Sequence, residues 1–135
     1  MPTSPDDCSV PLHPAALRGL ELFNAGEYFE AHEALEDAWR DETGPVRLLY
    51  QGILQVAVTY LHVQHDNYEG ALKLSARAGA KLAAWPATCR GIDIASLRAD
   101  LATVVASVEQ LGPSRLHSGD SRHLIGDQTT YLRCA

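Results

Sequence analysis

The sequence has few of the features that define several large classes of protein. Its 135 residues include only three cysteines, Cys8, Cys89 and Cys134, which are scattered with no CxxC spacing. We therefore expect neither a zinc-binding cysteine motif nor a disulfide framework. No run of about 18 apolar residues occurs, which argues against a membrane-spanning segment. Basic residues are outnumbered 11 to 17, and the net charge of −6 argues against a nucleic-acid-binding protein, because such proteins usually carry a basic face.

The N-terminal residues are not expected to form a secretory signal. The segment MPTSPDDCSV has neither the basic region nor the hydrophobic core of a secretory signal, so a cytoplasmic location is the default expectation. Residues 1–12 are rich in Pro, Ser and Asp and are expected to form a flexible N-terminus. Residues 13–112 are expected to form a single helical domain, followed by a loosely ordered C-terminal tail at 113–135. A hydrophobic content of 46% is ordinary for a soluble globular protein.

Apolar residues recur at helical spacing in five segments separated by turn residues. The predicted helices cover residues 14–24, 27–40, 45–65, 68–85 and 94–111. Asn24-Ala25-Gly26, Gly44-Pro45, Pro86 and Gly112-Pro113 mark the main breaks. The third helix is apolar on nearly all sides, which is typical of a central, buried helix. The predicted fold is all-α, a compact array or bundle of about five helices around that one.

The helix at 27–40 carries polar side chains on the face that its large apolar residues mark as buried. Phe29, Leu35 and Trp39 define that face, and His32 and Glu36 lie in its middle. Glu33 lies at its edge. A carboxylate in an apolar stripe costs several kcal/mol unless it is paired, hydrogen-bonded or bound to a metal. The sequence therefore predicts partners for His32 and Glu36 on other helices.

The helix at 45–65 offers such partners. Its polar residues Gln51, Gln55, His62 and His65 share one stripe, with Val58 between them. On a buried helix, such a stripe is expected to face other buried polar groups. The simplest arrangement brings Gln55 and His62 against His32 and Glu36.

Two ten-residue segments, GEYFEAHEAL (26–35) and DNYEGALKLS (66–75), are similar at an offset of 40 residues. Each follows another predicted helix through a short turn, as in the second half of a tetratricopeptide hairpin. Two hairpins are fewer than a solenoid needs, and any antiparallel helix pair favours an aromatic residue after the turn and a small residue one turn later. Both interpretations remain open.

Three motifs in order, FNAGEYFEAHEALEDAW, LLYQGILQVAVTYLHV and NYEGALKLSARAGAKL, resemble an uncharacterised family, domain of unknown function 309. The resemblance covers about residues 14–85 and implies a small all-α protein; some members carry the label of a predicted metal-dependent hydrolase. The motif positions it implies here are Glu30, His32, Glu33, Glu36, Trp39, Gln51, Gly52, Gln55, His62, Asn67, Gly70 and Ala71. Ser75 and Gly79 depart from expectation, because bulkier or better helix-forming residues would pack the helix at 68–85 more tightly.

Two classes of function follow. In the first, His32, Glu36 and His62 ligate a divalent metal such as zinc, which activates a water for hydrolysis with Glu33 as general base. In the second, the protein is a non-catalytic, tetratricopeptide-like interaction module, and the cluster is a structural hydrogen-bond network. A metal-free ligand pocket is a further reading of the same cluster. Besides the three metal-ligand candidates, the residues expected in this cluster are Gln51, Gln55, Trp39 and Asn67. A homodimer or another protein partner fits either class.

Overall fold

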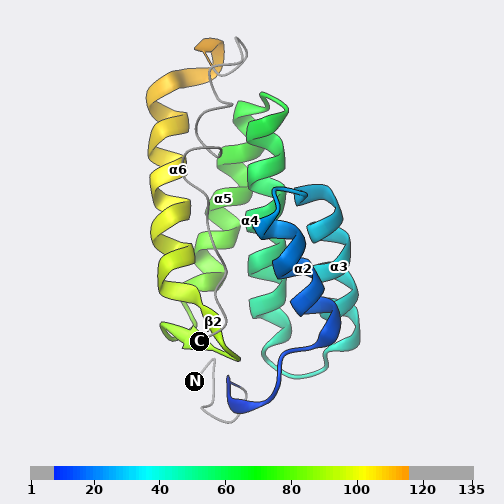
Figure 1. Cartoon of the computed structure of the whole chain (residues 1–135). Helices are drawn as coiled ribbons and strands as arrows, with labels where there is room; N and C mark the ends of the chain where they lie inside the picture. The colour runs from blue at the N-terminus through cyan, green and yellow to red at the C-terminus, as the bar shows by residue number, and fades with distance from the viewer. Residues whose placement is uncertain (1–7, 116–135) are drawn as a thin grey trace.

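The structure, a computed structural model, describes residues 8–115 and consists of five helices and one short hairpin (Figure 1). The elements are α2 (Pro14–Asn24), α3 (Tyr28–Asp41), α4 (Arg47–Gln64), α5 (Tyr68–Leu82), β1 (Thr88–Cys89), β2 (Ile92–Asp93) and α6 (Ile94–Arg115). The predicted all-α array of about five helices is confirmed. Most of the predicted flexible termini, residues 1–7 and 116–135, lie outside the described residues.

Helix α4 lies at the centre of the array, as its apolar composition predicts. It packs against α3 on one side and α5 on the other, while α2 packs on α3 and α6 on α5 (Figure 1). Tyr50, Ile53 and Tyr60 on α4 are fully buried. Because α4 contacts a helix on both flanks, its burial fixes the order in which the other helices can pack.

A cluster of three aromatic rings joins the first three helices. Phe23 of α2, Tyr28 of α3 and Tyr60 of α4 meet with ring centroids 5.3 to 5.5 Å apart. Two of the three pairs are edge-on, an arrangement that aromatic quadrupoles favour. Burial raises the pKa of Tyr28 to about 12, so its hydroxyl stays neutral in the core.

The two similar segments of the sequence form the same turn. Gly26 and Asp66 both adopt a positive φ, 81° and 59°. The next backbone N–H donates back across each turn, from Glu27 to the Leu22 carbonyl at 2.9 Å and from Asn67 to the His62 carbonyl at 2.8 Å. This is the hydrogen bond that closes a helix with a left-handed C-terminal residue. The internal similarity therefore corresponds to two helix pairs, α2–α3 and α4–α5, that are joined by the same kind of turn.

A short β-hairpin with two residues in each strand lies between the fourth and fifth predicted helices. Thr88 pairs with Asp93 and Cys89 with Ile92 in antiparallel register. Arg90 and Gly91 make the turn with φ of 50° and 80°, as a tight hairpin turn requires. The carboxylate of Asp93 accepts a hydrogen bond from the Ser96 N–H at 3.0 Å and so caps the start of α6.

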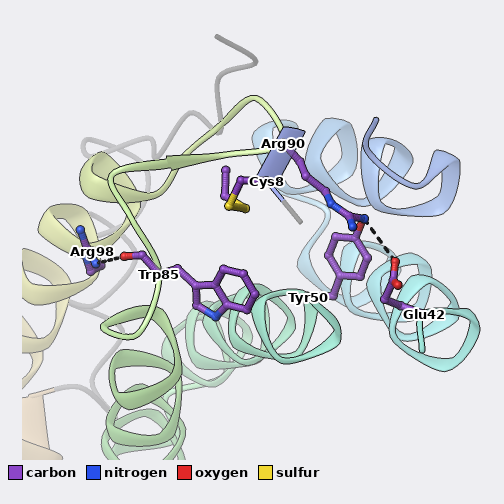
Figure 2. Close-up of a disulfide and its surroundings, with 7 residues drawn as sticks. Cys8, Glu42, Tyr50, Trp85, Arg90 and Arg98 are labelled. Atoms are coloured by element: carbon purple, nitrogen blue, oxygen red, sulfur yellow. Dashed lines mark hydrogen bonds and ion pairs between the residues drawn. A yellow bond between two sulfur atoms is a disulfide. The ribbon is translucent and has the colours of Figure 1, made fainter. Parts of the chain in front are cut away.

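The expectation that the cysteines form no disulfide is wrong. Cys8 and Cys89 are joined, with their Cα atoms 4.4 Å apart (Figure 2). The two residues are separated by 81 positions in the sequence, so no local spacing signals the bond. Only the packing of the helices returns the hairpin to the segment before α2.

Within residues 8–115, no helix combines the length and the apolar character needed to cross a membrane.

Two glycines offer a matched test of packing. A Cβ on Gly19 of α2 would lie 2.7 Å from Leu35 Cγ, whereas a Cβ on Gly79 of α5 would meet nothing within 4 Å. We expect Gly19→Ala to lower the free energy of unfolding by about 1–3 kcal/mol through overpacking. Gly79→Ala should raise it by about 0.5–1 kcal/mol, because alanine favours the helix. Urea unfolding measures both, and equal effects of the two substitutions would contradict the packing described.

Candidate functional site

His32 and Glu36 come together on α3, but at the margin of the core. His32 Nε2 lies 3.5 Å from Glu36 Oε2, and the two side chains are 27% and 32% exposed. Arg40, one turn further along, pairs with the other oxygen of Glu36. The Glu36 carboxylate thus finds its partners on its own helix and does not depend on a second helix for compensation.

The expected orientation of α3 is wrong in one respect. Its buried residues are Tyr28, Ala31, Ala34, Leu35 and Ala38. Phe29, expected to mark the buried face, is 52% exposed. At 3.6 residues per turn, His32 lies about 60° and Glu36 about 100° around the helix from Leu35. The alanines decide the rotation, because small side chains let α2 and α4 approach α3 closely.

Trp39 and Glu33 lie on opposite flanks of α3. Trp39 is half-buried, and the Arg47 guanidinium lies 4.2 Å from its ring centroid, while Arg47 Nε donates to the Trp39 carbonyl. Glu33 is exposed beside a depression of about 220 Å³ between α2 and α3. The lining of that depression is Ala15, Arg18, Leu22, Glu30, Glu33, Ala34 and Asp37. Glu33 therefore does not turn toward the side of α3 that carries His32 and Glu36.

The polar stripe on α4 is divided among different environments. Gln51 is half-buried, and Gln55 is buried with 9% exposure. The Gln55 Oε1 atom accepts no hydrogen bond from the described part of the chain. A buried carbonyl without a donor is uncommon and costs free energy.

His62 makes its contact at the end of α4, with the residue that starts the next helix. Its Nδ1 lies 3.1 Å from Asn67 Nδ2, and Asn67 Oδ1 accepts a hydrogen bond from the Gly70 N–H at 3.0 Å. Asn67 is thus the N-terminal cap of α5, and His62 contacts the side chain of that cap.

The three candidate metal ligands are not gathered in one place. Within residues 8–115, no three His, Cys, Asp or Glu side chains are grouped so that they could hold a metal ion. The structure brings His32 and Glu36 together, and it does not bring His62 into a ligand set with them. Two ligands on one helix are fewer than the three that a catalytic zinc site uses.

A larger hollow lies where the sequence predicts no site. A cleft of about 420 Å³ separates α5 from α6, and most of its exposed lining is apolar. The lining residues are Leu72, Ser75, Ala76 and Gly79 of α5 with Arg98, Leu101, Ala102, Val105 and Glu109 of α6. The signal for it was present in Ser75 and Gly79, the two small residues that predict loose packing of this helix. Both lie on the cleft wall.

The surroundings of His62 shift its titration. Burial lowers the pKa of His62 below the ordinary 6.5, and the nearby charge of His65 lowers it further. Because the folded state favours neutral His62, this contribution to stability is complete above pH 6.5 and is lost as the pH falls through 6.5 toward the lower folded pKa. We expect an NMR titration of the His62 ring to give a midpoint below 6.5 and to move upward in His65→Gln. A midpoint at or above the ordinary value would contradict this environment.

The comparisons place the chain among uncharacterised proteins. Residues 16–74 match the family described as "Domain of unknown function (DUF309)". An uncharacterised protein of Aquifex aeolicus is 26% identical over 95 residues, covering 70% of this chain and 28% of that protein. The uncharacterised protein YpuF of Bacillus subtilis is 35% identical over 60 residues, covering 44% of this chain and 34% of that protein.

The chain thus spans about a third of the length of the curated relatives that it matches. No solved structure matches it. The matched segment runs from α2 through the first half of α5 and includes His32, Glu36, Gln55 and His62. Residues 16–74 of this chain are therefore similar to the DUF309 family, a domain of unknown function.

Proposed function

We propose that the protein is a non-catalytic helical interaction module that holds an amphipathic helix of a partner protein in the cleft between α5 and α6. The observation that carries the proposal is the cleft itself, about 420 Å³ with a largely apolar lining. An apolar lining with the charged residues Arg98 and Glu109 in its wall suits the apolar face and charged flanks of an amphipathic helix. The two helix pairs α2–α3 and α4–α5, which are joined by the same kind of turn, support the same class of function, since stacked helical hairpins commonly present binding grooves.

The lining favours a helical occupant over an extended one. The cleft is formed by the side chains of two helices, whose backbone N–H and C=O groups are largely used within the helices. An extended segment would bring its own unpaired backbone groups against this apolar wall, and each would cost free energy. A helix satisfies its backbone internally and can present one apolar stripe to Leu72, Leu101 and Val105.

The charges at the two ends of the cleft favour one orientation. Arg98 lies at one end of the α6 wall, and Glu109 lies about three turns, or roughly 16 Å, further along. A helix of three to four turns therefore fits when an acidic residue near its N-terminus is placed by Arg98 and a basic residue near its C-terminus by Glu109. Acidic first turns and basic last turns also suit the macrodipole of the bound helix.

A blocking substitution tests the site. Ala76 lines the cleft, whereas Ala80, one turn further along α5, does not, and both are exposed. The probe is a 14-residue helical peptide with a leucine stripe, glutamate near its N-terminus and lysine near its C-terminus. We expect Ala76→Trp to weaken peptide binding, measured by fluorescence anisotropy, by about tenfold or more, which is about 1.4 kcal/mol. Ala80→Trp is the matched control and should bind as the native chain does.

A charge reversal in the cleft tests the proposed orientation of the bound helix. Glu109→Lys should reduce binding of the probe and favour a peptide with the two charges exchanged. Arg98 is left unchanged, because its Nη1 atom donates to the Leu82 and Trp85 carbonyls at 3.1 and 2.9 Å. If no peptide with an intact leucine stripe binds more tightly than one in which serine replaces leucine, the proposed function is wrong.

A further inference from the structure

The disulfide lies at the base of the α6 wall. Cys89 belongs to β1, and Cys8 belongs to the segment that precedes α2. The backbone N–H of Arg90 also donates to the Cys8 carbonyl at 2.8 Å. The hairpin is therefore tied to the N-terminal segment by a covalent bond and by a hydrogen bond one residue later.

The position of the hairpin sets the position of α6, because no linker separates them. Strand β2 ends at Asp93 and α6 begins at Ile94. The N–H groups of Ile94 and Ala95 both donate to the Ala87 carbonyl, at 2.8 and 3.0 Å, and Ile92 and Ile94 are fully buried. A movement of the hairpin would consequently be passed to the first turn of α6.

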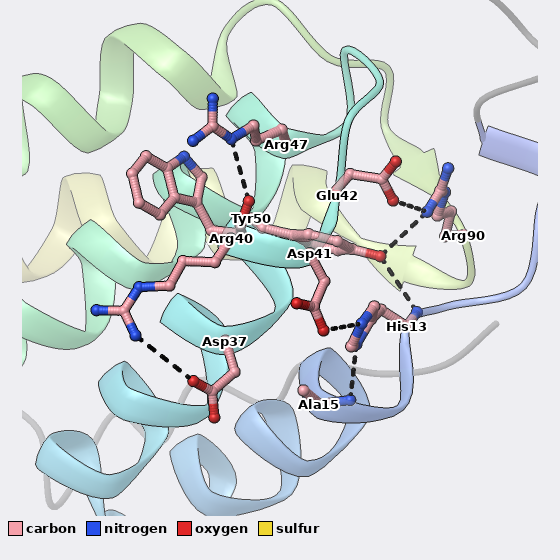
Figure 3. Close-up of polar contacts among 10 residues, drawn as sticks. His13, Ala15, Asp37, Arg40, Asp41, Glu42, Arg47, Tyr50 and Arg90 are labelled. Atoms are coloured by element: carbon pink, nitrogen blue, oxygen red, sulfur yellow. Dashed lines mark hydrogen bonds and ion pairs between the residues drawn. The ribbon is translucent and has the colours of Figure 1, made fainter.

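A polar contact holds the other side of the hairpin. Arg90 Nη1 donates to Glu42 Oε2 at 3.2 Å and to the Tyr50 hydroxyl at 3.1 Å, and the Arg90 side chain is 6% exposed (Figures 2 and 3). Burial opposes the charge of Glu42, but hydrogen bonds from the Gly44 backbone and Arg90 outweigh it and lower the pKa of the carboxyl. The His13 N–H donates to the same Tyr50 hydroxyl at 3.2 Å. Arg90 thus supplies a second, non-covalent tie to α4 that would survive reduction of the disulfide.

Helix α5 also holds α6. Arg98 of α6 donates to the Leu82 carbonyl at the end of α5 and to the Trp85 carbonyl just after it, and Figure 2 shows the Trp85 contact. The apolar stripe of α6 is buried in the core at Leu97 and Val104, and the cleft lies beside it. The base of α6 is therefore held by α5 as well as by the hairpin.

We propose that the Cys8–Cys89 disulfide is a redox clasp that fixes the base of α6 and so sets the width of the α5–α6 cleft. This inference concerns regulation of the cleft and rests on the proposed function for its binding consequence. In the oxidised chain the cleft has the shape described. In the reduced chain the helices remain, held by the core. The hairpin keeps its Arg90 contact to α4 and the backbone hydrogen bond to Cys8, and the hairpin and α6 gain freedom.

The chemistry requires a dithiol reductant. Its thiolate attacks Sγ of Cys8, which is partly exposed, whereas Cys89 is almost fully buried. The S–S bond breaks, Cys89 leaves as a thiolate and takes up a proton, and a mixed disulfide forms on Cys8. The second thiol of the reductant then displaces Cys8. Two electrons pass to the protein, two protein thiols are formed, and the reductant becomes a disulfide.

Amide hydrogen exchange of the full chain in the oxidised and dithiothreitol-reduced states tests the clasp. A Cys134→Ser background removes the third thiol and prevents disulfide exchange, and mass spectrometry verifies the redox state. We expect exchange in β1, β2 and the first two turns of α6 to rise by at least about threefold on reduction, since these elements then open locally. Exchange in α4 should be unchanged, and re-oxidation should restore the original rates. Cys8→Ser in the same background should reproduce the reduced state without a reductant.

The leucine-stripe peptide separates the two proposals. If the oxidised chain binds it, we expect the reduced chain to bind at least about threefold more weakly, because a less fixed cleft must be ordered on binding. If the peptide binds neither state while exchange in α6 rises on reduction, the clasp stands and the proposed function fails. If exchange in the hairpin and α6 is the same in both verified redox states, the clasp is overturned, whatever the peptide does.

Discussion

The burial of α4 on both flanks is the constraint on which the rest of the structure depends. A helix that is apolar on nearly all sides cannot bury its apolar surface against a single neighbour, so α3 and α5 both cover it. The turns at Gly26 and Asp66 then return the chain so that α2 and α5 lie antiparallel to their partners. The aromatic cluster of Phe23, Tyr28 and Tyr60 fills the junction where the first three helices meet. Little freedom remains in this half of the molecule.

The local part of the fold could be predicted from the sequence because local physics determines it. Apolar periodicity and the breakers Gly26, Pro86 and Gly112 mark the helices, and Asn67 and Asp93 act as caps through side chains only three residues from the N–H groups they accept. The rotation of α3 about its axis could not be predicted in the same way. If the buried face is chosen by its largest apolar side chains, Phe29 is expected to lie in it. Close packing of helices instead favours small side chains in the contact, so Ala31 and Ala38 face the core. That rotation moves His32 and Glu36 to the margin, where Glu36 pairs with Arg40 one turn along the same helix.

The remaining features are non-local, and no spacing in the sequence encodes them. Cys8 and Cys89 meet because the hairpin follows a helix that packs on the centre of the array. Arg90 reaches Glu42 and Tyr50 for the same reason. The α5–α6 cleft could be predicted from the sequence only in part. Ser75 and Gly79 indicate that α5 packs loosely on one face, but only the placement of α6 turns that looseness into a cavity.

The family match and the cleft occupy different parts of the chain, and this bears on how function is to be assigned. Residues 16–74 contain the His32–Glu36 pair and the α4 stripe, whereas the hairpin, α6 and most of the α5 wall lie beyond them. Within the family segment, the polar groups are mostly accounted for by local roles: Glu36 by Arg40 and His62 by the cap of α5. Gln55 is the exception, because its Oε1 atom is buried and accepts no hydrogen bond from the described residues. Outside the family segment, the disulfide and the Arg90 contact hold a hairpin whose position determines one wall of the cleft. The matched segment thus supplies the base of the fold, and the later elements form most of the cleft on it.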